Sequence, residues 1–124
     1  MSGIEKRKHD RISISVPVSC VSIDQEGSPL NFNMGVVKDV SQSGLALEVY
    51  CELVSDLVLL SFVDVGGKTL ELRGKAVYSK KTESGTIKVG VLLLGKPPEN
   101  IDFVRGLVKF YHYTKKSTLL AGVD

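Results

Sequence analysis

Hydrophobic and polar residues alternate along the first part of the chain as they do in strands that are buried on one side. From 12 to 20 every even position is apolar or cysteine and every odd position is serine or proline, which predicts a half-buried antiparallel strand. Pro17 falls on the outward phase, where its missing N–H is tolerated at an edge or a bulge. A turn-like segment at 24–29 leads to a second predicted strand at 30–38. The apolar face of that strand is expected to contain Leu30, Phe32, Met34 and Val36.

Four further strand-like segments follow a polar stretch at 39–44. They cover 45–50, 57–65, 69–80 and 86–94, and glycine-containing turns separate the later ones. In the last segment, one phase is apolar and is expected to face inward: Ile87, Val89, Val91 and Leu93. Six short strands joined by turns favour an all-β fold, a six-stranded antiparallel barrel of the split-barrel kind, because closure leaves no exposed strand edge.

The period of the pattern changes after Pro97 and Pro98. Apolar residues then recur at the spacing of a helix face: Ile101, Val104, Leu107, Val108 and Tyr111. A C-terminal α-helix is therefore predicted, either as a lid packed on the barrel or as a surface for a second copy. We expect a single domain with an N-terminal arm at 1–11, a barrel and helix at 12–113, and a loose tail at 114–124.

The composition is that of an ordinary globular domain. With 124 residues, of which 43% are hydrophobic and 24% charged, the chain can bury a core without disulfides, and global disorder is excluded. Cys20 and Cys51 lie in apolar strand-like patterns, so we expect buried free thiols. No segment approaches the about 20 apolar residues that span a bilayer, and the first residues lack the apolar core of a signal peptide. We therefore expect a cytoplasmic protein that does not enter the membrane.

Residues suited to catalysis are sparse. His9 and His112 lie at opposite ends of the chain, and no serine stands in a Gly-x-Ser-x-Gly elbow. The sequence Gly-Lys-Thr at 67–69 resembles the end of a phosphate-binding loop, but Phe62 stands where that motif requires glycine. The cysteines and histidines do not have zinc-ligand spacing. The sequence predicts no enzyme, no metal site and no cofactor.

Basic residues gather in the N-terminal arm. The whole chain has a net charge of only +2, yet residues 5–11 alone carry four basic and two acidic side chains. Arg7 and Arg11 lie about 13 Å apart at the backbone if the arm is extended, and their planar guanidiniums suit phosphate oxygens or the O6 and N7 edge of guanine. Lys6 and Lys8 are accessory candidates. Taken alone, these residues also fit a solvated basic tail.

The polar stretch 39–44 offers groups that complement the arginines. Asp39 can accept hydrogen bonds from N1 and N2 of guanine, and Ser41 can bind a phosphate through its hydroxyl. Gly44 can adopt a positive φ or let backbone N–H groups approach a ligand, and Ser43 is an accessory candidate. Taken alone, the stretch also fits an Asx-type turn bonded only to itself. Together with the arginine arm it describes a guanine nucleotide pocket.

These residues resemble the two motifs of the PilZ domain family, Arg-x-x-x-Arg and, two strands later, (Asp/Asn)-x-Ser-x-x-Gly. The matching residues are Arg7, Arg11, Asp39, Ser41 and Gly44. The sequence Val-Gly-Val at 89–91 also resembles the last barrel strand of that family, so the resemblance covers about residues 5–113. It implies a bacterial receptor for the second messenger cyclic di-GMP, which would bind on the outside of the barrel.

The resemblance also implies a role for each residue. The two arginines would grip guanine and phosphates, Asp39 and Ser41 would hold guanine, and Gly44 would shape the loop. The residue before the first arginine, here Lys6, is thought to influence whether one ligand or a stacked pair binds, so the number of ligands stays open. The arm would become ordered on the ligand and create a surface for a downstream protein partner, in a monomer or a homodimer.

Two alternatives belong to other functional classes. A PilZ-like barrel can act as a protein–protein interaction module that binds no nucleotide. A small RNA-binding barrel would need aromatic residues exposed on its strands; Phe32 is expected on the buried phase and tryptophan is absent. We therefore expect no nucleic acid partner.

Overall fold

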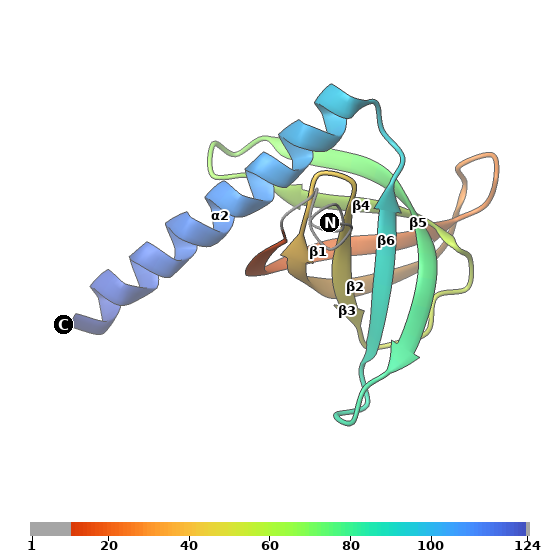
Figure 1. The fold of residues 1–124 in the computed structure, drawn as a ribbon, viewed down its shortest axis with the longest axis horizontal. Coiled ribbons are helices and arrows are strands. Elements are labelled where there is room, and N and C mark those ends of the chain that lie inside the picture. Colours follow the sequence, from red (N-terminus) through yellow and green to blue (C-terminus); the bar gives the residue numbers. More distant parts are fainter. Residues whose placement is uncertain (1–10, 124) are drawn as a thin grey trace, which may run out of the picture.

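Six strands and a long C-terminal helix make up the part of the chain that the structure describes. The computed structural model describes residues 11–123, with side chains as far as residue 115. The elements are β1 (Ile12–Ile23), β2 (Pro29–Val40), β3 (Gly44–Val49), β4 (Leu57–Val63), β5 (Thr69–Lys81), β6 (Ile87–Leu93) and α2 (Pro97–Val123). The strands close into a barrel in the order β1-β2-β3-β6-β5-β4, with every neighbouring pair antiparallel (Figure 1). The predicted antiparallel barrel with a C-terminal helix is confirmed.

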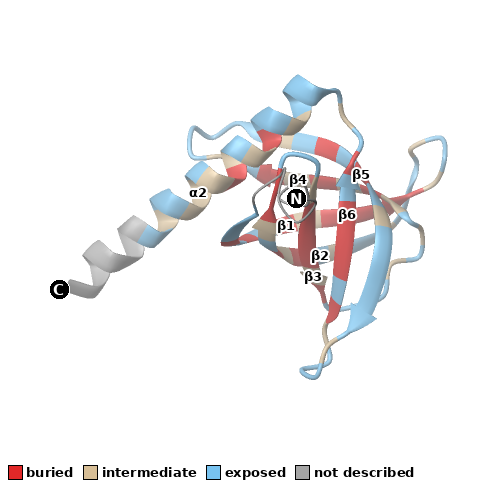
Figure 2. Cartoon of the chain, viewed as in Figure 1, coloured by how far each residue is buried: buried red, intermediate tan, exposed pale blue. Residues whose placement is uncertain are grey.

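The core of the barrel consists of the inward phase of each strand. The four predicted inward residues of β6 are all buried, and so are the even positions of β1 from Ile14 to Cys20. Figure 2 shows these buried positions as bands along the strands, while the connecting turns are exposed. Because a closed barrel encloses one side of every strand, the period-2 pattern of the sequence translates directly into an interior of interlocking aliphatic side chains.

The first half of β2 departs from the predicted phase. Leu30, Phe32 and Met34, expected on the buried face, are exposed, and the side chain of Phe32 is 74% accessible. The reason lies in the pairing of the strands: β3 pairs with β2 only from Gly35 onward, so β2 begins beyond the end of β3. Asn33, on the opposite phase, donates from Nδ2 to a carbonyl of the β3–β4 loop at 2.9 Å. The polar phase therefore turns toward the molecule here, and the apolar phase faces outward.

Helix α2 begins where its sequence supplies an N-terminal cap. The backbone N–H of Lys96 donates to Oε1 of Glu99 at 2.8 Å, which is one half of a capping box. Pro97 occupies the first helical position, where its fixed φ and missing N–H carry no penalty. The cap and the proline together determine the residue at which the helix starts.

Aromatic residues attach α2 to the open end of the barrel. The ring of Phe62 on β4 packs edge-to-face against Phe103 and Phe110, with ring centroids 5.4 and 6.1 Å apart. Phe103 and Leu107 are buried, while Val104, Val108 and Tyr111 pack against the core only in part. The buried face of α2 is thus rotated from the predicted apolar face toward the phenylalanines. In this structure the helix covers the barrel as a lid.

The helix continues beyond its predicted end. A loose tail was expected at 114–124, but α2 remains helical to Val123 and extends past the barrel (Figure 1). No proline or glycine occurs between Tyr113 and Leu120, and the residues there include the good helix formers lysine and leucine. Without a residue that terminates a helix, the backbone hydrogen bonding continues.

The two cysteines differ in their surroundings. Cys20 is fully buried, and this burial raises the pKa of its thiol from 9.0 to about 11 because the thiolate would lose its hydration. Cys51 is exposed in the loop after β3, so the expectation that both thiols are buried is wrong for Cys51. Its apolar neighbours in the sequence belong to the end of β3 and to the loop.

Candidate functional site

Asp39 lies near the end of β2 on the outer surface of the barrel. It is paired with Ser13 of β1 and with Ala46 of β3, and the register between β2 and β3 shifts between Val37 and Asp39. Such an irregularity re-aims the side chains beside it. The predicted bend therefore starts later than expected, since Asp39 and Val40 still belong to the strand and only the following residues turn.

The structure brings Arg11 and Asp39 together across 28 positions of sequence. Nη1 of Arg11 donates to Oδ1 of Asp39 and forms an ion pair with it. Arg11 precedes β1 and lies two positions from Ser13, the residue opposite Asp39, so the two side chains are diagonal neighbours on the outer face. The Arg11 side chain is 59% accessible and that of Asp39 24%. A pair this exposed contributes at most about 1 kcal/mol to stability, so its main effect is on the position of the two groups.

Of the predicted arm residues, the structure describes Arg11. Arg7, Lys6 and Lys8 lie outside the described residues. Arg11 is therefore the member of the arginine pair whose position relative to the bend is known. Its guanidinium lies beside the carboxylate that the sequence singled out.

Ser41 directs its hydrogen bonds into the bend itself. Its backbone N–H donates to the carbonyl of Gly44 at 2.8 Å, and its Oγ donates to the same oxygen at 3.3 Å. The residue is also buried. Ser43 is exposed, and its carbonyl accepts a hydrogen bond from Leu93 N at 3.0 Å. The bend is thus closed by its own backbone and tied to the end of β6, which is the geometry expected of a structural turn.

Gly44 serves a purpose different from the expected one. Its φ is not positive, whereas Gly27, Gly67 and Gly85 do have positive φ. A Cβ at Gly44 would lie 2.7 Å from the backbone oxygen of Val91. The expectation of a positive φ is therefore wrong: glycine is required here because β3 and β6 approach closely behind the bend.

A row of paired residues runs from Asp39 across the outer surface of the barrel. Asp39 is opposite Ala46, Ala46 is opposite Gly90, and Gly90 is opposite Tyr78. Three strand spacings separate the ends of the row, or roughly 14 Å. The two central residues are small and both are buried, Ala46 with only 3% of its surface accessible, so the accessible groups of the row are those at its two ends. Sequence reasoning missed Tyr78.

The ring of Tyr78 lies flat against the strand beside it. A Cβ at Gly90 would be 2.1 Å from Cε2 of Tyr78, so the ring occupies the space that a side chain would otherwise take. Tyr78 remains 52% accessible. The glycine on the outward phase of β6 is the sequence feature that could have indicated an aromatic ring lying over it.

Helix α2 borders the site on another side. A hollow of about 420 Å³ lies between Ile12, Gln42 and the helix residues Ile101, Val104, Arg105, Val108 and Lys109. Gln42 belongs to the bend, and Ile12 directly follows Arg11. The cations of Arg105 and Lys109 are therefore near the point where the arm meets the barrel, a relation that the helical pattern alone did not reveal.

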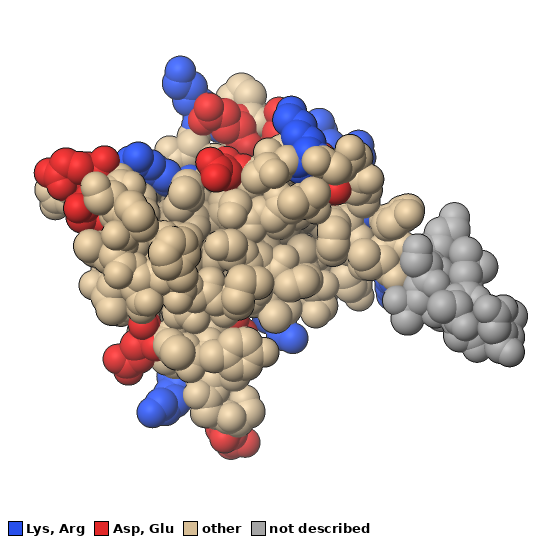
Figure 3. Space-filling view, turned by 180° about the vertical axis from the view of Figure 1, so that it is seen from behind, with Lys and Arg blue, Asp and Glu red and all other residues tan. Residues whose placement is uncertain are grey.

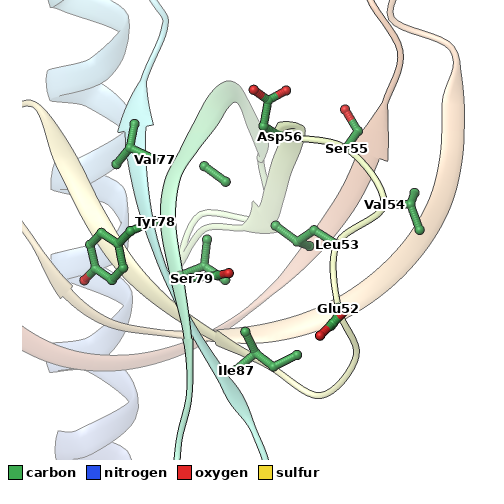
Figure 4. Close-up of a pocket in the computed structure, with 11 residues that line it drawn as sticks. Glu52, Leu53, Val54, Ser55, Asp56, Val77, Tyr78, Ser79 and Ile87 are labelled. Atoms are coloured by element: carbon green, nitrogen blue, oxygen red, sulfur yellow. The ribbon is translucent and has the colours of Figure 1, made fainter.

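A second hollow lies at the opposite end of the barrel, beneath the loop after β3 (Figure 4). It has a volume of about 470 Å³, with Leu53, Ile87 and Val89 among its apolar lining and Glu52 and Asp56 among its polar lining. The lining contains no basic side chain. In the close-up, the Tyr78 ring is on the other side of β5 from Leu53. Two carboxylates without a cation repel phosphates, so this hollow does not suit an anionic ligand.

The described residues contain neither a cluster of metal ligands nor a membrane-spanning helix. Within residues 11–123, no three His, Cys, Asp or Glu side chains come close enough together to hold a metal ion. No helix in that part of the chain combines the length and apolarity needed to cross a bilayer.

Comparisons with known proteins agree with this fold. The family model for the PilZ domain matches residues 5–110. Among solved structures, the "PilZ domain with c-di-GMP of YcgR from Escherichia coli" has the same fold, with a TM-score of 0.61 and 10% sequence identity over 91% of this chain and 97% of that one. No curated protein sequence matches. Because the family model spans both motifs and nearly all of the barrel, the chain belongs to the PilZ domain family.

Proposed function

We propose that this protein is a cyclic di-GMP receptor that holds the dinucleotide between the arginine arm and the Asp39–Gly44 bend. The observation that carries the proposal is the contact between Arg11 and Asp39, which brings one residue of each motif to a single place on the outer barrel. The family match, which includes both motifs, and the cyclic di-GMP named for the YcgR domain support the choice of ligand.

The donors and acceptors of the site complement a guanine nucleotide. The guanidiniums of Arg7 and Arg11 bind the phosphates and the O6 and N7 edge of guanine, while Asp39 accepts from N1 and N2. Oδ1 of Asp39 already accepts from Arg11. Since a carboxylate offers about four lone-pair sites, it can accept from guanine and arginine together. The proximity of Arg11 then orients the carboxylate and neutralises part of its charge before phosphates approach.

The rest of the motif supplies the framework. Ser41 and Gly44 hold the bend and the close approach of β6, and the accessory residues Lys6, Lys8 and Ser43 lie around the ligand. Tyr78 forms the far wall of the site, where the accessible face of its ring stacks on a base. Stacking of a base on an aromatic ring contributes about 1–3 kcal/mol.

The site binds its ligand without catalysis. The hydroxyl of Ser41 donates to a backbone carbonyl and not to a general base. The output is structural: the arm becomes ordered on the ligand and forms, with the barrel, a new surface that a downstream protein partner reads. Ordering costs roughly 1–2 kcal/mol per residue in backbone entropy, which charge-assisted hydrogen bonds and stacking offset.

Isothermal titration with cyclic di-GMP tests the proposal. The wild-type chain should bind at micromolar ligand or below, and the titration also counts one or two ligands per chain. Arg11→Ala and Asp39→Ala should each weaken binding at least tenfold, since each removes a charged partner, and Tyr78→Ala should weaken it about tenfold through lost stacking. Arg73→Ala removes an exposed arginine of β5 and is expected to leave affinity unchanged.

Two outcomes would count against this function. Absence of binding at micromolar ligand would favour the alternative of an interaction module that binds only protein. Equal affinity of wild type, Arg11→Ala and Asp39→Ala would place the ligand elsewhere. A salt-dependent shift with single-stranded RNA, and none with the dinucleotide, would favour an RNA-binding barrel.

A further inference from the structure

Three adjacent strands present an outer surface without charge. In the closed barrel, β1 lies between β4 and β2. Strands β1 and β4 contain no charged residue, and β2 contains none before Lys38. Figure 3 shows, on the barrel seen from behind, a broad area without Lys, Arg, Asp or Glu, while the charged side chains that the view contains lie around its rim. We call the outward residues of these strands the uncharged face: Pro17, Ser19, Leu30, Phe32, Met34 and Val63.

The uncharged face exposes large apolar side chains. The accessible fractions of its four largest members range from 52% for Leu30 to 74% for Phe32. In the same half of β2, Asn31 and Asn33 occupy the other phase and are partly buried. Folding alone does not favour an arrangement in which the amides turn inward and the apolar groups face water. Contiguous exposed apolar surface of this kind marks an interaction site.

The face has both a projection and a hollow. The hollow, of about 430 Å³, is bounded by Met34 of β2, Val63 of β4 and Phe110 of α2, and Pro17 forms part of its wall. Phe32 projects two positions along β2 from Met34, about 7 Å away. A projecting aromatic ring beside a hollow of the same surface is self-complementary under a two-fold axis, because each copy can insert its ring into the hollow of the other.

We propose that the uncharged face is an interface with a second copy of this chain, related by a two-fold axis. Phosphates of a nucleic acid and anionic lipid headgroups require basic partners, which the face lacks. β2 pairs with β3 only from Gly35 onward, and the β3–β4 loop contacts its first half through Asn33, so the proposed interface uses the outward apolar side chains of β2 and not a backbone edge. Two uncharged faces packed together bury apolar surface and leave the charges of both copies in water.

The interface would adjoin the proposed ligand site without depending on it. Lys38 and Asp39 follow the apolar stripe along β2, so the two surfaces meet at one end of that strand. Association through the face requires no ligand. Its failure and the failure of the receptor proposal are therefore separate results.

Sedimentation velocity over two decades of protein concentration, without nucleotide, tests the inference. Wild type should change from monomer to dimer as its concentration rises. Phe32→Lys and Met34→Lys should each weaken dimerisation at least tenfold, since each places a charge in the centre of the interface. Val77→Lys is the matched control: Val77 is an exposed valine on β5, and its replacement should leave the dimerisation constant unchanged.

Circular dichroism and titration with cyclic di-GMP accompany the sedimentation runs. The substituted side chains are exposed, so each variant should keep the spectrum of the wild type. A wild type that stays monomeric at every concentration would overturn the inference. It would equally be overturned if Val77→Lys dissociated the dimer as strongly as Phe32→Lys, or if the folded Phe32→Lys variant still formed a dimer of wild-type affinity.

Discussion

At the scale of single residues, Gly44 shows how a family motif can contain a packing requirement. Its neighbour across the strand pair is the backbone of β6, and the Val91 oxygen lies only 2.7 Å from the place of the first side-chain carbon. A backbone atom cannot move aside as a flexible side chain can, so any larger residue separates β3 from β6. The bend that presents Asp39 is built on this contact.

Gly44→Ala should therefore destabilise the protein by about 1–3 kcal/mol, the usual effect of inserting atoms into a filled space. Urea unfolding followed by far-UV circular dichroism measures the change. Gly66→Ala is the matched control, because a Cβ at Gly66 would meet the Asp64 carboxylate at an ordinary 3.5 Å, and its effect should stay within about 0.5 kcal/mol. Equal stability of Gly44→Ala and wild type would show that the strands can separate freely.

The candidate residues differ in how far sequence could identify them. Arg11 and Asp39 were found because each carries a charged group suited to a nucleotide and stands beside a strand. Tyr78 was not, since it lies 39 positions after Asp39 and reaches the same surface only when β5 pairs with β6 and closes the barrel. Contacts of this kind depend on register, which local patterns do not determine.

At the scale of elements, the attachment of α2 depends on a cluster of aromatic rings. Phe62 of β4 contacts both Phe103 and Phe110, which lie two helical turns apart on α2. The helical period predicted a buried face, but it favoured the aliphatic residues beside this line. The pattern predicts well where a helix lies in the sequence, but it predicts less well which face of the helix is buried. In α2 two neighbouring stripes are apolar, and either could face the barrel.

Phe103→Ala should destabilise the protein by about 3–5 kcal/mol, since it removes a buried ring from between α2 and the barrel. The change is measured by urea unfolding. Tyr113→Ala removes another aromatic ring from the same helix, but one that is exposed, and should shift stability by no more than about 0.5 kcal/mol. Similar effects of the two substitutions would show that α2 contributes through helix formation alone and not through packing.

Strand β2 shows where the period-2 pattern is insufficient. The alternation located the strand correctly, yet both of its phases contain apolar residues, among them Phe32 and Met34 on one and Val37 on the other. The buried phase is determined by the partner strand, and β3 does not extend along the first half of β2. The expected face was therefore the exposed one, and it is the feature on which the inference of a second copy depends.

At the scale of the whole molecule, closure of the barrel can be monitored through one thiol. Cys20 lies in the second half of β1 and is paired with Asn33 of β2 on one side and with Leu60 of β4 on the other. It cannot meet water unless both pairings open, so its ionisation is linked to unfolding of the entire barrel. Cys51 lies in an exposed loop outside the barrel strands.

Global stability should therefore fall at alkaline pH through Cys20. Burial raises the pKa of its thiol from 9.0 to about 11. Below pH 9 the thiol is neutral in both states, and its burial contributes fully to the free energy of unfolding. Between pH 9 and 11 the thiol ionises in the unfolded chain but stays neutral in the folded one, so this contribution is lost as the pH rises. The loss approaches roughly 2–3 kcal/mol, two pKa units at about 1.4 kcal/mol each. Urea unfolding across this range should show a shallower decline for Cys20→Ala than for wild type, while Cys51→Ala keeps the wild-type slope. Each variant differs from wild type at one cysteine alone, so the difference in slope isolates the buried thiol. Parallel declines for wild type and Cys20→Ala would mean that water reaches Cys20 while the barrel remains closed.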